Sequence, residues 1–521
     1  MARLGIDFGT TNTVAVAHDR GMFSVVLHEA DTGAGRIVQE VLPSAILLGP
    51  QPDQRFFGLE ADRRFAQLGR TDGWTLIPSL KRQLRDYAEG RMAGDADVDV
   101  AALLEGFLDS LAASIRTSLD LDDAEPLEAV ITWPANANGA QRHITRQCFR
   151  RAGFEVLATL NEPTASAIEL ADCVASGRRG RDRKAASAVA VFDLGGGTFD
   201  ASVVWIEDDD FRVLTSSGIE SLGGDDFDEV LLAMLLERLK LPGDAVGPLA
   251  RHALLRQLRS QKEMIASGAT QSLFLNPGDF GLSGAPTTIP VEGYFERLRP
   301  MLAPAVQTLG RVIDSAAAKE PRIGAAAPLT IYLVGGSSKL PLVAQMVGEA
   351  FETSRVVLTD KPFRSVAMGA AIAATDRVTV RDVFARHFGL IRLSDHGRRE
   401  HFATIFPAGT AMPRRGEAPL EKVAWYHPMH TVGHLRYLEC TTIGDDGLPA
   451  GDVRAWSDIL FPYDPAEPLS ACLPSGAIEP TDRFADQAVC EVYRCDADGV
   501  ITVELRRPGA RDARCYEIYQ D

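Results

Sequence analysis

Two segments of the chain place an aspartate just before a turn rich in glycine and threonine. Asp7 precedes the turn at 9–12, and Asp193 precedes the turn at 195–198. Glycine lets a backbone approach an anion closely, successive N–H groups of such a turn point at it, and hydroxyls add donors. A neighbouring aspartate can hold Mg²⁺ through the waters that the ion prefers to keep. Two such turns facing each other across a cleft predict a site for a magnesium–nucleotide complex.

Either turn alone could belong to an ordinary β-hairpin that uses glycine for its geometry. The two aspartates are 186 residues apart, and twice that spacing ends near an Ala/Gly-rich segment at 368–372 that has the pattern of a helix. Residues 1–378 are therefore predicted to form two similar α/β halves. Within them we expect strands at 128–132 and 329–334 and helices at 140–151 and 227–239, because β-branched runs alternate with helical spacing.

A third glycine element, Leu333–Lys339, follows an apolar strand and precedes a predicted helix near Pro341. Its backbone could approach a flat ligand such as adenosine. More familiar phosphate loops are missing, since the chain has no Gly-x-x-x-x-Gly-Lys-Ser/Thr and no Gly-x-Gly-x-x-Gly that opens a helix. This disfavours a P-loop ATPase and a dinucleotide-dependent oxidoreductase.

Composition narrows the class of protein further. Fifty-four Lys and Arg against 71 Asp and Glu give a net charge of −17 over 521 residues, which disfavours binding to nucleic acid or to an anionic membrane surface. Seven cysteines in so long a chain form no secreted disulfide framework. No apolar run reaches about 18 residues, and the N-terminus lacks the apolar stretch of a signal peptide. We expect a soluble cytoplasmic protein.

Beyond about residue 385 the pattern changes to strands and turns, with strands expected at 434–439 and 500–505 and a hairpin turn at Asp498-Gly499. This predicts a β-rich C-terminal domain at 389–521, joined to the first 378 residues by a linker at 379–388. Cys490 and Cys495 should face opposite sides of one strand as buried structural thiols, because they are separated by an odd number of residues.

The glycine segments resemble a known family when they are taken together and in order. Ile6–Asn12, Phe192–Asp200 and Leu333–Pro341 look like the three characteristic motifs of the 70-kDa heat-shock (DnaK-like) chaperone family. Further segments between them are similar in family order: Ile131–Ala135, Gln141-Arg142, Asn161–Ala165 and Leu222–Asp228. The resemblance implies an α/β, actin-like ATPase domain of two similar, ribonuclease-H-like lobes over 1–378. It also implies a sandwich-like substrate-binding domain at 389–521, here without the family's helical lid.

The resemblance also implies roles for residues that match the motifs. The catalytic set would be Lys81, Glu162, Asp193, Thr198 and Asp200, with Lys81 orienting the attacking water. Asp7 and Asp193 would position Mg²⁺. ATP or ADP would be bound by Gly9, Thr10, Thr11, Asn12, Gly195, Gly196, Gly197 and Thr198 around the phosphates, and by Gln261, Lys262, Glu263, Gly335, Gly336, Ser337 and Lys339 around adenosine. Pro134 and Arg142 match the family's relay from nucleotide to linker.

The implied function is a slow ATPase that acts as a chaperone, assisting protein folding or binding peptide segments. Its partners would be an unfolded polypeptide or a dedicated client, a co-chaperone and a nucleotide-exchange factor. Two alternatives keep the same ATPase core: an interaction module for one dedicated partner, and a phosphotransferase of the actin-like or sugar-kinase-like type. The chain departs from the family pattern at Arg259, at Phe363-Arg364 and in the linker run Val383–Arg386, where acids and leucines are usual.

Overall fold

The structure is a computed structural model of the chain. It describes residues 2–31, 36–68, 73–83, 99–177 apart from 136 and 138, 186–394 apart from 220, 244–245, 269, 281–283 and 360, and 399–518 apart from 415, 465–480, 485 and 508–512. The chain divides into two compact units. The first comprises Met1–Ala135 and Arg146–Thr379, and the second comprises Val380–Asp521 with the short segment Asn136–Thr145.

The first sheet of the first unit has the strand order β11-β10-β1-β2-β3, and β6 pairs with β2. β11, β10 and β1 run parallel to one another, whereas β2 and β3 add as antiparallel neighbours. The strands are β1 (Arg3–Phe8), β2 (Asn12–Asp19), β3 (Met22–Val25), β6 (Leu42–Pro43), β10 (Leu127–Trp133) and β11 (Phe154–Asn161). The hairpin β1–β2 therefore carries the first glycine turn at the end of a parallel strand.

The second sheet repeats this arrangement with the order β18-β17-β12-β13-β14-β19. β18, β17 and β12 are parallel, and β13 and β14 follow as antiparallel strands. The strands are β12 (Ser187–Leu194), β13 (Phe199–Glu207), β14 (Asp210–Ile219), β17 (Leu329–Val334), β18 (Arg355–Leu358) and β19 (Thr379–Arg381). The hairpin β12–β13 carries the second glycine turn in the equivalent position.

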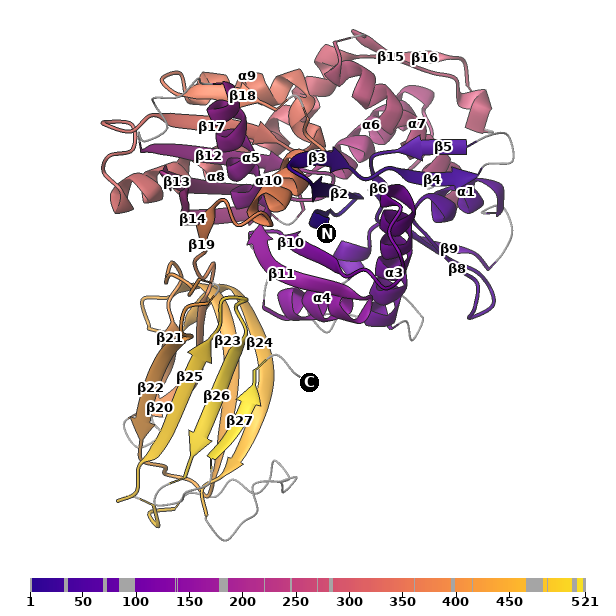
Figure 1. The fold of residues 1–521 in the computed structure, drawn as a ribbon. Helices are drawn as coiled ribbons and strands as arrows, with labels where there is room; N and C mark the ends of the chain where they lie inside the picture. The colour runs from indigo at the N-terminus through magenta and orange to yellow at the C-terminus, as the bar shows by residue number, and fades with distance from the viewer. Residues whose placement is uncertain are drawn as a thin grey trace. The chain divides into compact units, whose positions relative to one another are not determined.

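Two helices pack between these sheets, as Figure 1 shows at the centre of the first unit: α5 (Glu162–Gly177) and α10 (Ser365–Ala373). Glycines allow this close packing. A Cβ added to Gly5 of β1 would lie 2.1 Å from the Ala371 nitrogen, and one added to Gly369 would lie 1.7 Å from the Ala165 carbonyl oxygen. The helical pattern predicted at 368–372 is thus confirmed, because small residues there let α10 contact both β1 and α5.

The other elements of the first unit surround these layers, and the predicted elements at 128–132, 140–151, 227–239 and 329–334 are confirmed as β10, α4, α6 and β17. The helices are α1 (Gly58–Leu68), α3 (Val100–Leu119), α4 (Gly139–Arg151, which extends into the second unit), α6 (Gly224–Leu239), α7 (Pro248–Ala266), α8 (Val291–Lys319), α9 (Pro341–Ala350), and the short 3-10 turns η1 (Pro277–Phe280) and η2 (Gly336–Lys339). Smaller sheets contain β4 (His28–Asp31), β5 (Arg36–Gln39), β7 (Ile46–Leu48), β8 (Arg55–Phe57), β9 (Thr75–Ile77), β15 (Ser272–Leu275) and β16 (Thr287–Pro290).

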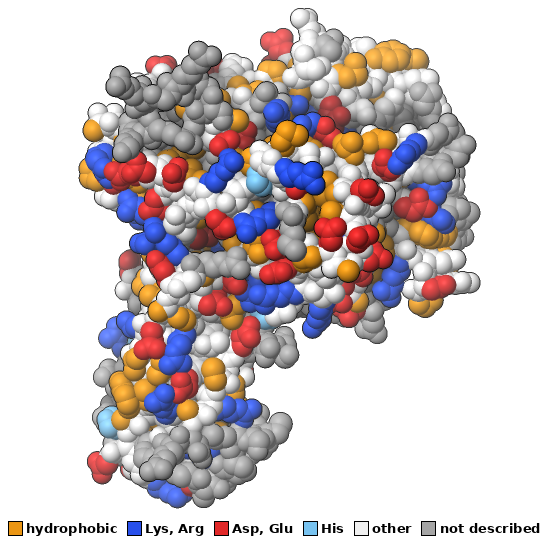
Figure 2. Space-filling model, viewed as in Figure 1, with side chains coloured by type: hydrophobic (Ala, Val, Ile, Leu, Met, Phe, Trp, Pro, Cys, Tyr) orange, Lys and Arg blue, Asp and Glu red, His pale blue; other side chains and the backbone are white. Residues whose placement is uncertain are grey.

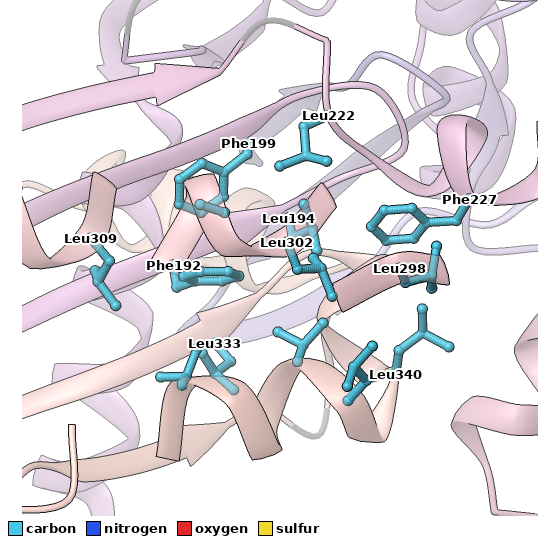
Figure 3. Packing of buried hydrophobic residues seen from close by; sticks show 14 of the residues in the cluster. Phe192, Leu194, Phe199, Leu222, Phe227, Leu298, Leu302, Leu309, Leu333 and Leu340 are labelled. Carbon is cyan, nitrogen blue, oxygen red and sulfur yellow. The ribbon is translucent and has the colours of Figure 1, made fainter. Parts of the chain in front are cut away.

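A hydrophobic core anchors the second glycine turn. Figure 3 shows Phe192 and Leu194 of β12 packed among side chains of α8 and neighbouring elements, including Leu298 and Leu302. Both β12 residues are fully buried. Because successive side chains of a strand point to opposite faces, the burial of these two side chains fixes Asp193 between them on the other face.

The second unit contains two four-stranded antiparallel sheets, with orders β21-β20-β23-β24 and β22-β25-β26-β27, that share one hydrophobic core. The strands expected beyond residue 385 are present, and so is the expected turn at Gly499, whose φ is +77°. The strands are β20 (His387–Ser394), β21 (Arg399–Phe406), β22 (Leu420–Tyr426), β23 (Val432–Ile443), β24 (Pro449–Pro462), β25 (Val489–Cys495), β26 (Ile501–Arg506) and β27 (Ala513–Glu517). Cys490 and Cys495 are both buried free thiols, as predicted.

Part of the segment predicted as a linker is folded. β19 and β20 occupy its two ends, at Thr379–Arg381 and from His387 onward. Phe384 between them is 8% exposed and donates its backbone N–H to the carbonyl of Thr410 at 2.9 Å. The apolar side chains at 383, 384 and 388 are buried, which explains why this stretch packs rather than stays extended.

Charged side chains of both signs are interspersed on the face that Figure 2 shows, with no large field of a single sign. In the described parts of the chain, no helix is both long enough and apolar enough to span a membrane.

Candidate functional site

The first glycine turn connects β1 to β2. Asp7 is the penultimate residue of β1 and lies opposite Val14 of β2. The turn leaves no space for a side chain at Gly9, where an added Cβ would lie 2.2 Å from the carbonyl oxygen of Asn12. The Ser44 hydroxyl braces the turn by donating to the Gly9 carbonyl at 2.8 Å. Asp7 is therefore held at the edge of a rigid hairpin.

The second glycine turn connects β12 to β13 and lies directly against the first. Asp193 is opposite Asp200 in this hairpin, and the Gly195 N–H donates to the Thr198 carbonyl at 3.0 Å. A Cβ added to Gly196 would lie only 2.0 Å from the hydroxyl oxygen of Thr11. The two turns are thus in contact, and both border one cleft.

Most of the residues predicted to bind a nucleotide line this cleft, which encloses about 960 Å³ when the solvent at its mouth is counted. The predicted residues in its lining are Asp7, Gly9, Thr10, Thr11, Asn12, Glu162, Asp193, Gly195, Gly196, Thr198, Lys262, Glu263, Gly335, Gly336 and Ser337.

Lys81 reaches this cleft through an ion pair. It lies in a helical turn at 80–83, and its Nζ is 2.5 Å from Oε1 of Glu162, with both side chains about one-tenth exposed. Glu162 begins α5, where the preceding Asn161 caps the helix by accepting from the Thr164 N–H at 2.8 Å. The ion pair joins the helical turn at 80–83 to the start of α5, where Glu162 lines the cleft.

The carboxyl groups at the cleft floor have raised pKa values. Burial and the charge of Glu162 raise the pKa of Asp7 to about 7, although Lys81 and a hydrogen bond from Thr132 oppose this rise. Burial raises the pKa of Asp193 well above its usual value, and the charges of Glu162, Asp200 and Asp7 add to the effect. Carboxylates crowded in this way are stabilised in their charged form by a nearby cation.

The donor set suits a magnesium–polyphosphate complex. The hydroxyl of Thr11 is buried and makes no hydrogen bond among the described residues, so it is free to donate to a ligand oxygen. In the described part of the chain, no group of three or more His, Cys, Asp or Glu is arranged to hold a metal directly. Asp7 and Asp193 both line the cleft, and two carboxylates fit an ion that keeps waters and phosphate oxygens as its other ligands.

The third glycine segment closes the cleft behind the second turn. Gly335 has φ +82°, and a Cβ there would lie 2.3 Å from the Leu194 carbonyl oxygen. The Ser337 hydroxyl donates to the Gly195 carbonyl at 2.8 Å. A Cβ on Gly224 at the start of α6 would lie 2.5 Å from the same hydroxyl oxygen. Three glycine segments distant in sequence thus meet at one place.

Two cationic side chains of helix α7 form ion pairs with acidic side chains of α6. Lys262 is 2.6 Å from Asp228 and also donates to the Gly224 carbonyl at 2.5 Å. Arg259 contacts Asp225 at 2.6 Å and Asp228 at 3.1 Å. Burial lowers the pKa of Lys262 and raises that of Asp228. The unusual Arg259 is therefore accommodated by the two acids of α6.

Sequence reasoning missed the pairing of Arg82 with Asp225. Arg82 Nη2 lies 3.5 Å from Asp225 Oδ2, and it would be 2.5 Å from a Cβ on Gly197. Arg82 is thus seated on the second glycine turn and paired with α6. The only sequence signal is its position next to Lys81.

Some predicted residues lie outside the cleft lining. Gly197 is covered by Arg82. Asp200 is buried and lies opposite Asp193 in the hairpin, and the Lys339 ammonium is 5.4 Å from the ring of Phe363. Gln261 is bound through its side chain to the carbonyl of Phe274. The predicted relay residues also lie elsewhere: Pro134 follows β10, and Arg142 lies on α4, where its Nε donates to the Ala137 carbonyl at 3.0 Å.

Comparison of the chain with known proteins gives one family model and relatives that share one description. Residues 107–384 match the family model described as Hsp70 protein. The chain is 30% identical over 390 residues to the chaperone protein HscA homolog of Azotobacter vinelandii and 32% identical over 389 residues to that of Burkholderia ambifaria. These alignments cover 71% of this chain but only 57% and 58% of the relatives, so the chain spans little more than half of their length.

Proposed function

Because this chain belongs to the Hsp70 family, we propose that it is an ATP-hydrolysing chaperone that assists protein folding or binds peptide segments in the cytoplasm. One observation carries the proposal: the two aspartate-bearing turns meet at Thr11 and Gly196 and border a single cleft. A cleft with glycine-rich backbone on both sides and paired acids at its floor suits a magnesium-bound polyphosphate.

We assign residues 1–378 to an actin-like nucleotide-binding domain with two ribonuclease-H-like lobes. The matching strand orders of its two sheets support this assignment. Residues 389–521 are assigned to a substrate-binding domain, and residues 379–388 connect the two. The shared core of the two C-terminal sheets supports a sandwich that would hold an extended polypeptide.

In this proposal Thr10, Thr11 and Asn12 bind the phosphates of ATP from one side, and the turn at 195–198 binds them from the other. Mg²⁺ held by Asp7 and Asp193 through water would neutralise charge on the phosphates. The hydroxyl of Thr11 is placed to donate to a phosphate oxygen. The adenosine end is assigned to Lys262, Gly335, Gly336, Ser337 and Lys339.

Lys81 is assigned to the attacking water. Hydrolysis forms a bond from the water oxygen to the γ-phosphorus while the bond to the leaving oxygen of ADP breaks, and charge on the phosphoryl oxygens must be stabilised. The Lys81 ammonium, held 2.5 Å from Glu162, is positioned to orient the water and to offset this charge. Glu162, Thr198 and Asp200 complete the polar surroundings.

The partners are also part of the proposal. The relatives are described as chaperone proteins, which favours an unfolded polypeptide or a dedicated client as substrate. A co-chaperone and a nucleotide-exchange factor would set the rates of hydrolysis and release. Pro134 and Arg142 would couple the nucleotide to the connecting segment.

One experiment tests the proposed function as a whole. Steady-state ATP hydrolysis by the full chain is measured with and without a permanently unfolded, alkylated model protein. We expect slow hydrolysis that needs Mg²⁺ and changes when the unfolded protein is added. A rate of ATP hydrolysis that does not change with the unfolded protein but rises with a small-molecule acceptor would contradict a chaperone and favour a phosphotransferase.

A further inference from the structure

Phe363 places an aromatic ring in the wall of the cleft, away from the phosphate-binding turns. It lies in the turn before α10 and lines the cleft together with Pro362 and Val366. The side chain is 41% exposed. An exposed ring that faces a cleft offers a flat apolar surface that a bound molecule could cover.

The backbone of the third glycine segment holds this ring in place. A Cβ on Gly336 would lie 2.7 Å from Cε1 and 3.2 Å from Cζ of Phe363, so the ring lies against the bare backbone of Gly336. The ammonium of Lys339 lies 5.4 Å from the ring centroid, within the range of a cation–π contact. The ring is therefore positioned before any ligand arrives.

Most charged side chains near Phe363 are paired or negative, and one cation, Lys339, lies over the ring itself. The two cations of α7 at this end of the cleft, Arg259 and Lys262, are both engaged by Asp225 and Asp228. Glu263 lines the same wall and adds a further negative charge. This end of the cleft is thus suited to a neutral, flat group with polar edges rather than to phosphate.

We propose that Phe363 stacks against the base of the bound nucleotide. This inference rests on the proposed function and identifies the side chain that holds the base. Every nucleobase has a π face, so stacking on an aromatic ring raises affinity without choosing between bases. Phe363 should therefore contribute to binding of ATP and GTP alike and contribute nothing to binding of the phosphates.

The test compares Phe363→Ala, Phe363→Leu and Phe363→Trp in the full chain. Calorimetry gives the dissociation constants of Mg-ATP, Mg-GTP and Mg-tripolyphosphate. We expect Phe363→Ala to weaken both nucleotides by about 10- to 100-fold, with tripolyphosphate binding unchanged. Phe363→Trp should bind nucleotides as the unaltered chain does, and Phe363→Leu should resemble the alanine variant. Phe274→Ala is the matched control, because Phe274 is 58% exposed on β15 and does not line the cleft.

Four results would overturn the inference. Unchanged nucleotide binding by Phe363→Ala would show that the ring does not contribute to affinity. Tighter binding would show that the ring obstructs the base. Full binding by Phe363→Leu would show that apolar contact is enough without stacking. An equal loss of tripolyphosphate binding would show that the ring only supports the neighbouring turn. Absence of nucleotide binding in the unaltered chain would overturn the proposed function itself, and with it this inference.

Discussion

Thr11 and Gly196 contact each other in the lining of one cleft, although they are 185 positions apart in the chain: a Cβ on Gly196 would lie 2.0 Å from the hydroxyl oxygen of Thr11. Each residue belongs to a turn that follows an aspartate-bearing strand. The contact brings two sets of backbone N–H groups to one place, and only glycine fits at position 196. This relationship underlies the proposed binding of a magnesium-complexed nucleotide.

Lys81 should act on hydrolysis rather than on ATP binding. We expect Lys81→Ala to slow single-turnover hydrolysis about a hundredfold, equivalent to about 3 kcal/mol, because the charge it offsets develops in the transition state. The dissociation constant for ATP should change little. Lys422→Ala, which removes an exposed lysine of β22, is the control. Equal turnover in Lys81→Ala would remove this lysine from the mechanism.

The Asp225 carboxylate should slow release of the nucleotide. It pairs with Arg82, which lies on the second glycine turn, and with Arg259 of α7, so it ties elements on both sides of the cleft together. Partly exposed pairs contribute about 0.2–1 kcal/mol each, so Asp225→Asn should speed release of a fluorescent ATP analogue about two- to fivefold.

Stopped-flow displacement with excess unlabelled ATP measures this rate. Glu237→Gln serves as the control, because it breaks an exposed pair with Arg297 that does not line the cleft. The interpretation is wrong if Asp225→Asn and Glu237→Gln release the analogue at the same rate.

His28 should make stability depend on pH. It is fully buried beside Ser114, and burial lowers its pKa from 6.5 to about 4. The folded state therefore favours the neutral ring. Its contribution to the free energy of unfolding is complete above pH 6.5 and is lost as the pH falls toward 4. The loss amounts to about 3 kcal/mol.

Urea unfolding at pH 7 and pH 4, followed by circular dichroism, checks this effect. The unaltered chain should lose about 3 kcal/mol more unfolding free energy over this range than His28→Gln, which cannot titrate there. Parallel losses in the two proteins would show that His28 is not the source of the pH dependence.

The positions of the glycine turns could be predicted from sequence because their chemistry is local. Asp7 and Asp193 each lie one residue before the end of the strand that leads into their turn, and β17 occupies the residues that its apolar run predicted. The repeat of an aspartate, glycine and threonine also indicated that the turns would pair. Such patterns are short and depend on neighbours in the chain.

Contacts between distant elements could not be predicted in this way. Nothing in the sequence indicates that Arg82 pairs with Asp225, since both are ordinary surface residue types far apart in the chain. The folded stretch around Phe384 was also missed, because its few apolar residues show no clear period. Tertiary packing, not local pattern, decides such contacts.

The most direct test of the central claim is calorimetry of Mg-ATP binding to the unaltered chain and to Gly196→Ala. One added methyl group would collide with Thr11, so we expect saturable heat from the unaltered chain and binding at least about tenfold weaker in the variant. Gly348→Ala in α9, where an added Cβ meets nothing within 4 Å, should bind like the unaltered chain. Absence of heat from the unaltered chain, or equally tight binding by Gly196→Ala, would contradict the account.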